Sequence, residues 1–188
     1  MSSSVENFNV KTLEIGGLGA ALTALRLPFS KECRSKVDFS FIQEPEIDLV
    51  QYRTAITFEP KDLELMQTLL KRGDEHAKAL RGITVYCEIN APRFFWQEMV
   101  TYRIGSECLS SESTMHVDCR GLSGEELTKA KEEIKEGLMQ KRVFVFNYQT
   151  LRRIYKQRKD HRLPHWHKFC DWIKTLPYSK ELITNGLD

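Results

Sequence analysis

Hydrophobic and polar positions follow two different periods along the chain, which predicts strands in some segments and helices in others. Residues 10–15 and 83–89 are short runs rich in branched and aromatic side chains, as is typical of strands. Residues 60–72 repeat apolar side chains at helical spacing. Pro60 at the start of that pattern and Gly73 at its end predict the two ends of a helix.

A glycine-rich segment, Gly16-Gly17-Leu18-Gly19, opens an alanine-rich helix that is expected to run through Leu25. The glycine spacing matches part of a dinucleotide-binding phosphate loop, but no second strand with an acidic end follows it. Close packing of the helix against another segment also requires glycine, and it is the favoured explanation.

The rest of the chain predicts further helices. Ser123 and Glu126 have the spacing of a capping box at the start of a highly charged helix that is expected to reach Met139. Other helices are expected at residues 148–159 and 166–175, residues 143–146 are expected to form a buried strand or a helix start, and residues 28–57 give mixed signals with a turn at 44–46.

The segment from Ile89 to His116 changes character halfway along. Asn90-Ala91-Pro92 is predicted to break the preceding strand, and the aromatic and apolar residues after it indicate a helix whose face includes Tyr102. Beyond Gly105 the chain carries many small hydroxyl side chains: Ser106, Ser110, Ser111, Ser113 and Thr114. Hydroxyls beside Arg103 predict an anion-binding turn, although an ordinary polar loop has the same composition.

Composition narrows the classes of protein. With 188 residues, 41% hydrophobic and 29% charged, the chain suits one domain spanning residues 1–188, with residues 1–9 expected to be a flexible leader. A net charge of +2 gives no global case for nucleic-acid binding. Five scattered cysteines indicate free thiols, and with neither a signal sequence nor a long apolar run the expected setting is the cytoplasm, not a membrane.

Two other clusters of residues suggest chemistry. The basic run from Arg152 to Arg162 could bind phosphate or nucleic acid, although charged runs on helices are usually solvated faces. Histidines and cysteines spaced as His-x-x-Cys offer a conceivable zinc site, but the spacing is not that of an established zinc motif, and a packed helix start is favoured: His116 with Cys119, and His167 with Cys170. No metal is therefore expected.

One motif resembles the flavin-dependent thymidylate synthases. That family carries Arg-His-Arg, seven residues and then Ser, and this chain has Thr101-Tyr102-Arg103, seven residues and Ser111. The resemblance extends to most of the chain, in Ala91-Pro92-Arg93-Phe94-Phe95-Trp96-Gln97 before the motif, Ser106, residues 17–29, His76, residues 147–151 and the pair Gln157-Arg158.

The resemblance implies an α+β fold with a central antiparallel sheet and flanking helices, assembled as a homotetramer with sites between subunits. It implies FAD as cofactor, NADPH as reductant, methylenetetrahydrofolate as carbon donor and a pyrimidine deoxynucleotide as substrate. His76, Arg103, Ser106 and Asn147 would bind the flavin. The substrate would contact Ser111, Ser113, Arg153 and Arg158, with Ser111 and Arg158 at the reaction centre.

Several positions depart from the family pattern. Thr101 and Tyr102 replace arginine and histidine, Glu98 replaces glutamine, and Ser113 replaces an arginine that holds phosphate. A charged hydrogen bond contributes about 1.5–3 kcal/mol, so these changes weaken the expected phosphate contacts. They motivate an altered nucleotide or a hydroxymethyl product. They also motivate an alternative, a fold relative without synthase activity that binds nucleotides or nucleic acid.

Overall fold

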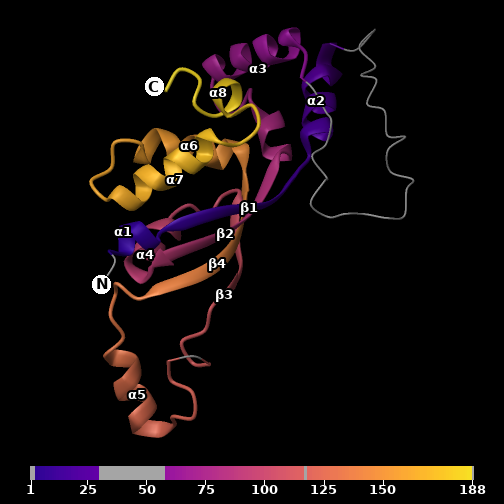
Figure 1. The fold of residues 1–188 in the computed structure, drawn as a ribbon. Coiled ribbons are helices and arrows are strands. Elements are labelled where there is room, and N and C mark those ends of the chain that lie inside the picture. The colour runs from indigo at the N-terminus through magenta and orange to yellow at the C-terminus, as the bar shows by residue number, and fades with distance from the viewer. Residues whose placement is uncertain (1–2, 30–57, 117, 188) are drawn as a thin grey trace.

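Four strands form one antiparallel sheet in the order β1-β2-β4-β3 (Figure 1). The structure is a computed structural model that describes residues 3–29, 58–116 and 118–187. The strands are β1 (Asn9–Gly16), β2 (Thr84–Pro92), β3 (Ser106–Ser111) and β4 (Met139–Asn147). The central antiparallel sheet implied by the resemblance is confirmed. Because β1 pairs antiparallel with β2, the parallel sheet of a dinucleotide-binding domain is excluded.

The helices lie around this sheet. They are α1 (Ser4–Asn7), α2 (Leu18–Arg26), α3 (Pro60–Arg72), α4 (Arg93–Met99), α5 (Gly124–Glu132), α6 (Tyr148–Arg158), α7 (Pro164–Lys174) and α8 (Ser179–Leu182), with short 3-10 turns η1 (Leu27–Phe29) and η3 (Lys78–Gly82). The predicted helices at residues 60–72, 148–159 and 166–175 are confirmed within two residues at each end. Most of residues 28–57 lie outside the described part of the chain.

Aromatic side chains join α4 and α7 to one face of the sheet. Phe95 packs 4.5 Å from Trp166 between ring centroids, and Phe169 contacts Phe146 of β4 at 5.9 Å. All four rings are buried. Trp166 and Phe169 are three residues apart and so share one face of α7. This face and Phe95 of α4 pack into the same core.

Residues 3–9, part of the expected flexible leader, are packed on this core. Ser3 forms a capping box with Glu6 at the start of α1. Phe8 is buried, with its ring 5.1 Å from that of Phe95. The aromatic contact therefore anchors the start of the described chain beside α4.

The glycine-rich segment before α2 is a point of close packing. Gly17 has a φ of +81°, and a Cβ atom there would lie 1.8 Å from the carbonyl oxygen of Gly82. Only glycine tolerates both the left-handed backbone and this contact. The packing explanation for the segment is confirmed.

Three boundaries differ from the sequence predictions. The predicted break at Asn90-Ala91-Pro92 is wrong, because β2 continues through Pro92, which then caps the start of α4. The capping box at Ser123 is also wrong, since its side chain makes no cap hydrogen bond. α5 ends at Glu132 rather than near Met139, because residues from Met139 pair with β2 and form β4. Residues 143–146, predicted as a buried strand or a helix start, are therefore part of a strand.

α5 and its connecting segments project from the sheet as an arm, away from the other helices (Figure 1). Each residue of α5 keeps some exposure to solvent. No helix among residues 3–29, 58–116 and 118–187 is long and apolar enough to cross a membrane.

Candidate functional site

The hydroxyl-rich segment is a strand and not the predicted turn. Ser106 to Ser111 form β3, paired with β4, and Ser110 and Ser111 are exposed. Successive side chains of a strand point to opposite faces, so these hydroxyls cannot all face one anion. Ser106 donates to the carbonyl oxygen of Tyr102, and Ser113 lies partly buried in the turn that follows the strand.

The start of β3 is tied to the first turn of α6. The Thr150 hydroxyl donates to the Ile104 carbonyl at 2.6 Å, and the Asn147 backbone N–H donates to the Gly105 carbonyl at 2.9 Å. Asn147 also caps α6, accepting from the Thr150 backbone N–H at 2.8 Å. These bonds hold the segment that directly follows the exposed Arg103 against the positive end of the helix.

Gly105 is required at this junction. Its φ is +76°, and a Cβ atom would lie 2.2 Å from the Asn147 amide nitrogen and 2.5 Å from the Thr150 hydroxyl. The glycine that separates α4 from β3 in sequence thus allows the chain to approach α6 closely.

A second loop reaches the same end of α6. Gln149 donates to the Asp74 carbonyl at 2.7 Å and accepts from Arg81 at 2.6 Å. His76 is exposed and lies two residues beyond Asp74, in the loop between α3 and η3. The structure therefore brings the segments that carry His76, Arg103, Ser106 and Asn147 to the N-terminal end of α6, although these segments come from three separate parts of the chain.

Arg158 lies at the opposite end of α6, in an ion pair with Glu98. Arg158 Nη1 is 2.5 Å from Glu98 Oε2, and Arg158 Nε donates to the Tyr102 hydroxyl at 2.7 Å. Both charged side chains are largely shielded, with 16% of Arg158 and 31% of Glu98 exposed. Two departures from the family pattern, Glu98 and Tyr102, thus contact a residue that the pattern retains.

The same Glu98 oxygen has further donors. Trp166 Nε1 donates to it at 2.9 Å, and His161 Nε2 lies 3.4 Å away. The Arg158 guanidinium also stacks on the Trp166 ring, 4.5 Å from its centroid. Sequence reasoning missed this pair because Glu98 and Arg158 are 60 residues apart. From the sequence, Glu98 is only a change that weakens the expected phosphate contacts.

Ser111 lies at the other end of β3 from this helix. Ser106 pairs with Phe146 near the start of α6, whereas Ser111 pairs with Arg142. Five residues of strand extend about 16 Å. Within one chain, Ser111 is therefore separated from the residues grouped around the N-terminal end of α6.

The basic run on α6 and beyond is not one cationic surface. Arg152 donates to the carbonyls of Ile183 and Asn185 at 2.7 and 2.9 Å, and burial lowers its pKa, an effect that Asp74 opposes. Arg153 donates to the Ile104 carbonyl at 3.2 Å. With Arg158 paired to Glu98, these three cations serve the fold, which weakens the case for nucleic-acid binding.

The histidine and cysteine pairs that made a zinc site conceivable do not form one among the described residues. Within the described ranges, no three His, Cys, Asp or Glu side chains are grouped closely enough to hold a metal ion. His165 is buried against Phe8 and Phe94, and burial lowers its pKa. Burial likewise raises the pKa of the Cys170 thiol to about 12, as expected of a core residue.

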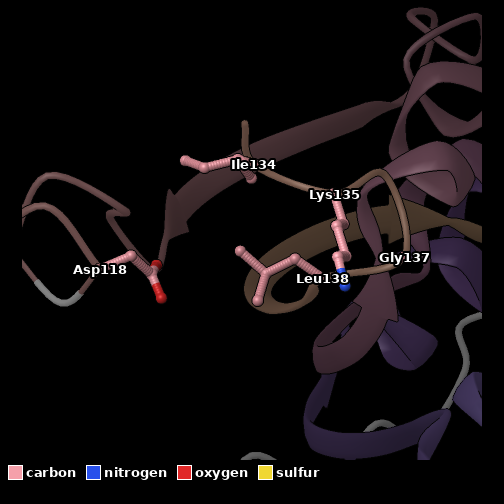
Figure 2. A pocket seen from close by; sticks show the side chains of 5 residues that line it. All are labelled: Asp118, Ile134, Lys135, Gly137 and Leu138. Atoms are coloured by element: carbon pink, nitrogen blue, oxygen red, sulfur yellow. The ribbon is translucent and has the colours of Figure 1, made fainter. Parts of the chain in front are cut away.

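Two surface hollows of about 390 Å³ each occur among the described residues. Figure 2 shows one of them, which contains none of the predicted site residues; it lies beside the segments that flank α5 and is lined by Asp118, Ile134, Lys135, Gly137 and Leu138. The other lies where the end of β3 meets β4 and the middle of β2, and it is lined by Glu88, Ser110, Ser111, Glu112, Lys141, Arg142 and Val143.

The fold was compared with known proteins. No model of a protein family matches the sequence, and no curated protein is significantly similar to it. Among solved structures, thymidylate synthase X from Helicobacter pylori with FAD and dUMP aligns with a TM-score of 0.68 and 15% identity, over 96% of this chain and 99% of that one. The chain has the fold of this enzyme.

Two further structures support that likeness. A second structure of the Helicobacter pylori flavin-dependent enzyme, complexed with FAD and dUMP, aligns with a TM-score of 0.65 and 15% identity over 96% of this chain and 100% of that one. The UMP/dUMP methylase PolB from Streptomyces cacaoi, bound with 5-Br dUMP, aligns with a TM-score of 0.63 and 11% identity over 94% of both chains. At these identities the likeness shows the fold alone.

Proposed function

We propose that the protein is a flavin-dependent enzyme that transfers a one-carbon unit from methylenetetrahydrofolate to a pyrimidine deoxynucleotide. The substrate is dUMP or an altered relative, and the product carries a methyl or hydroxymethyl group. The observation that carries this proposal is the convergence of His76, Arg103, Ser106 and Asn147 on the N-terminal end of α6, in a fold shared with a structure that holds FAD and dUMP.

The residues at this end of α6 suit FAD. A diphosphate is an anion, and the N-terminal end of a helix presents backbone N–H groups and a partial positive charge. Arg103 adds an exposed cation that forms no ion pair with the other described residues. His76 adds an exposed imidazole from the neighbouring loop. When bound, a reduced flavin supplies the hydride that the reaction needs, with NADPH as the reductant.

In the same proposal the substrate lies toward the other end of α6. Arg158 orients and polarises the pyrimidine through N–H groups that Glu98 and Tyr102 leave available, and Arg153 and Ser113 contribute to binding. Within one chain, Ser111 lies at the far end of β3 from the residues around the N-terminal end of α6. A homotetramer with sites between subunits would resolve this, because the Ser111 of one subunit can complete the site of another.

An absorbance spectrum of the purified protein with and without added FAD tests the cofactor. We expect a flavin spectrum that persists after removal of free FAD. Arg103→Gln is expected to weaken FAD binding about tenfold, the loss of one charged hydrogen bond. Arg72→Gln, an exposed change at the end of α3, serves as the matched control. A protein that gains no flavin absorbance with excess FAD would exclude the proposal.

Release of tritium from the pyrimidine ring of labelled dUMP, in the presence of FAD, NADPH and methylenetetrahydrofolate, tests the reaction. Light scattering after gel filtration tests the homotetramer. A monomer at assay concentration that still releases tritium would contradict the shared site.

A second function is favoured by the Glu98–Arg158 ion pair. A retained arginine whose charge is already neutralised has less to offer a nucleotide. This observation supports a fold relative without synthase chemistry, and any binding of nucleotides or nucleic acid by it would have to use other residues. Flavin binding without tritium release from any pyrimidine nucleotide, or a steeply salt-dependent affinity for nucleic acid without flavin, would favour it.

A further inference from the structure

Arg142 of β4 lies at the end of a column of stacked aromatic rings. Its guanidinium carbon is 4.6 Å from the centroid of the Trp96 ring. Trp96 stacks on Phe144 at 5.6 Å with 2° between the planes, and Phe144 stacks on Phe146 at 5.4 Å with 10°. The column fixes the plane of the guanidinium before any ligand arrives.

A neutral side chain holds this cation. Arg142 Nε and Nη2 donate to the amide oxygen of Gln140 at 3.2 and 3.0 Å. Within residues 3–29, 58–116 and 118–187, no carboxylate lies within ion-pair distance of Arg142. Burial lowers the Arg142 pKa, the Cys108 thiol opposes that shift, and Arg93 adds to it. The site thus holds a shielded positive charge that lacks a counter-charge.

Ser111 projects beside this arginine. The two residues are direct partners across β3 and β4, and partners in an antiparallel pair point to the same face of the sheet. Glu88 is paired with Val143 and belongs to the opposite face, where it is 3.9 Å from Lys141 Nζ, and the Glu112 carboxylate accepts from the Lys141 backbone N–H at 2.8 Å. They therefore do not neutralise Arg142.

We propose that Arg142 and Ser111 together bind the phosphate group of the nucleotide substrate. This inference rests on the proposed function and names the cation that replaces the arginine missing at Ser113. A planar guanidinium can donate two parallel hydrogen bonds to phosphate oxygens, and a serine hydroxyl can add a third. Arg158 and Arg152 are less suited, because Glu98 neutralises the first and backbone carbonyls occupy the second.

Calorimetric titrations with dUMP, deoxyuridine and inorganic pyrophosphate, with FAD present throughout, test this site. Arg142→Gln is expected to weaken dUMP binding by about tenfold or more, the loss of a charged hydrogen bond, while deoxyuridine binding is unchanged. Arg142→Lys is expected to restore part of the loss, since it keeps the charge without the planar fork. Arg72→Gln is the control and is expected to match the unchanged protein.

The titrations separate failure of this site from failure of the proposed function. If neither dUMP nor deoxyuridine binds the unchanged protein, the proposed substrate is wrong, and pyrophosphate alone then tests Arg142. Pyrophosphate affinity that falls about tenfold in Arg142→Gln supports an anion site even in that case. Equal affinities of the unchanged protein and Arg142→Gln for dUMP and pyrophosphate would overturn the inference.

Discussion

Two arginines stack on tryptophan in this protein, and their partners differ. Arg158 lies 4.5 Å from the Trp166 centroid and pairs with the carboxylate of Glu98. Arg142 lies 4.6 Å from the Trp96 centroid and pairs with the amide of Gln140. The first positive charge is cancelled within the fold, whereas the second remains available to an anion. The partner of a stacked arginine, more than the stacking, decides whether the cation serves stability or binding.

We expect the largest effect on stability from removing the carboxylate that neutralises Arg158. Glu98→Ala leaves Arg158 without its carboxylate and Trp166 Nε1 without its acceptor. Because both side chains are largely shielded, we expect the free energy of unfolding to fall by about 2 kcal/mol. Urea denaturation measures it. Gln140→Ala at the other stack is the matched control, with an expected loss of about 0.5 kcal/mol.

Replacing each arginine by methionine separates the two stacks further. Arg158→Met keeps an apolar side chain over Trp166 but leaves the Glu98 carboxylate without its ion-pair partner. We expect the free energy of unfolding to fall by about 1–2 kcal/mol. Arg142→Met removes a charge that forms no ion pair within the described residues, so the stability of this variant is expected to stay within about 0.5 kcal/mol of the unchanged protein. Equal losses in urea denaturation would contradict the difference between the stacks.

Gln140→Glu should convert the second stack into a copy of the first. The new carboxylate would lie where the amide oxygen now accepts from Arg142 Nε and Nη2. We expect pyrophosphate affinity to fall about tenfold, and stability to rise by less than about 1 kcal/mol, the value of a partly exposed ion pair. Calorimetry and urea denaturation of the same sample measure both. Unchanged pyrophosphate binding would place the anion elsewhere.

Salt should produce the smallest effect. Raising sodium chloride from about 0.05 to 0.5 M shortens the screening length severalfold, so pyrophosphate binding is expected to weaken about threefold. The loss of stability caused by Glu98→Ala is expected to change by less than about 0.5 kcal/mol, because a shielded pair is screened less. Denaturation and titration at both salt concentrations check this contrast.

Local pattern predicted most of the fold that the structure describes. Apolar spacing together with Pro60 and Gly73 predicts the helix at residues 60–72, and the helix predicted at 148–159 ends one residue earlier, at Arg158. Local pattern failed where pairing partners decide the outcome. The pattern predicts that the charged helix reaches Met139, but hydrogen bonds to β2 and β3 make residues 139–147 a strand. Ser106 to Ser111 have the composition of a turn and nevertheless pair with β4.

The candidate site divides in the same way. The resemblance named His76, Arg103, Ser106 and Asn147 from motif spacing, and the structure places them around one end of α6. It also named Arg158, but not the Glu98 and Trp166 partners that neutralise and cover it. Arg142 carries no motif at all. We propose a role for it because it stacks on Trp96, lies opposite Ser111 in the sheet and has no carboxylate partner among the described residues. None of these features can be seen in the spacing of residues along the chain.

By itself, the sequence determined which segments form the main helices and where glycine is needed, because capping, apolar periodicity and backbone freedom act over a few residues. Only the tertiary structure decided the antiparallel order of the sheet and which charged side chains are neutralised. Whether an arginine is neutralised depends on which side chain reaches it across the fold. Glu98 and Arg158 meet over 60 residues of chain, and Arg142 meets no such partner within the described residues.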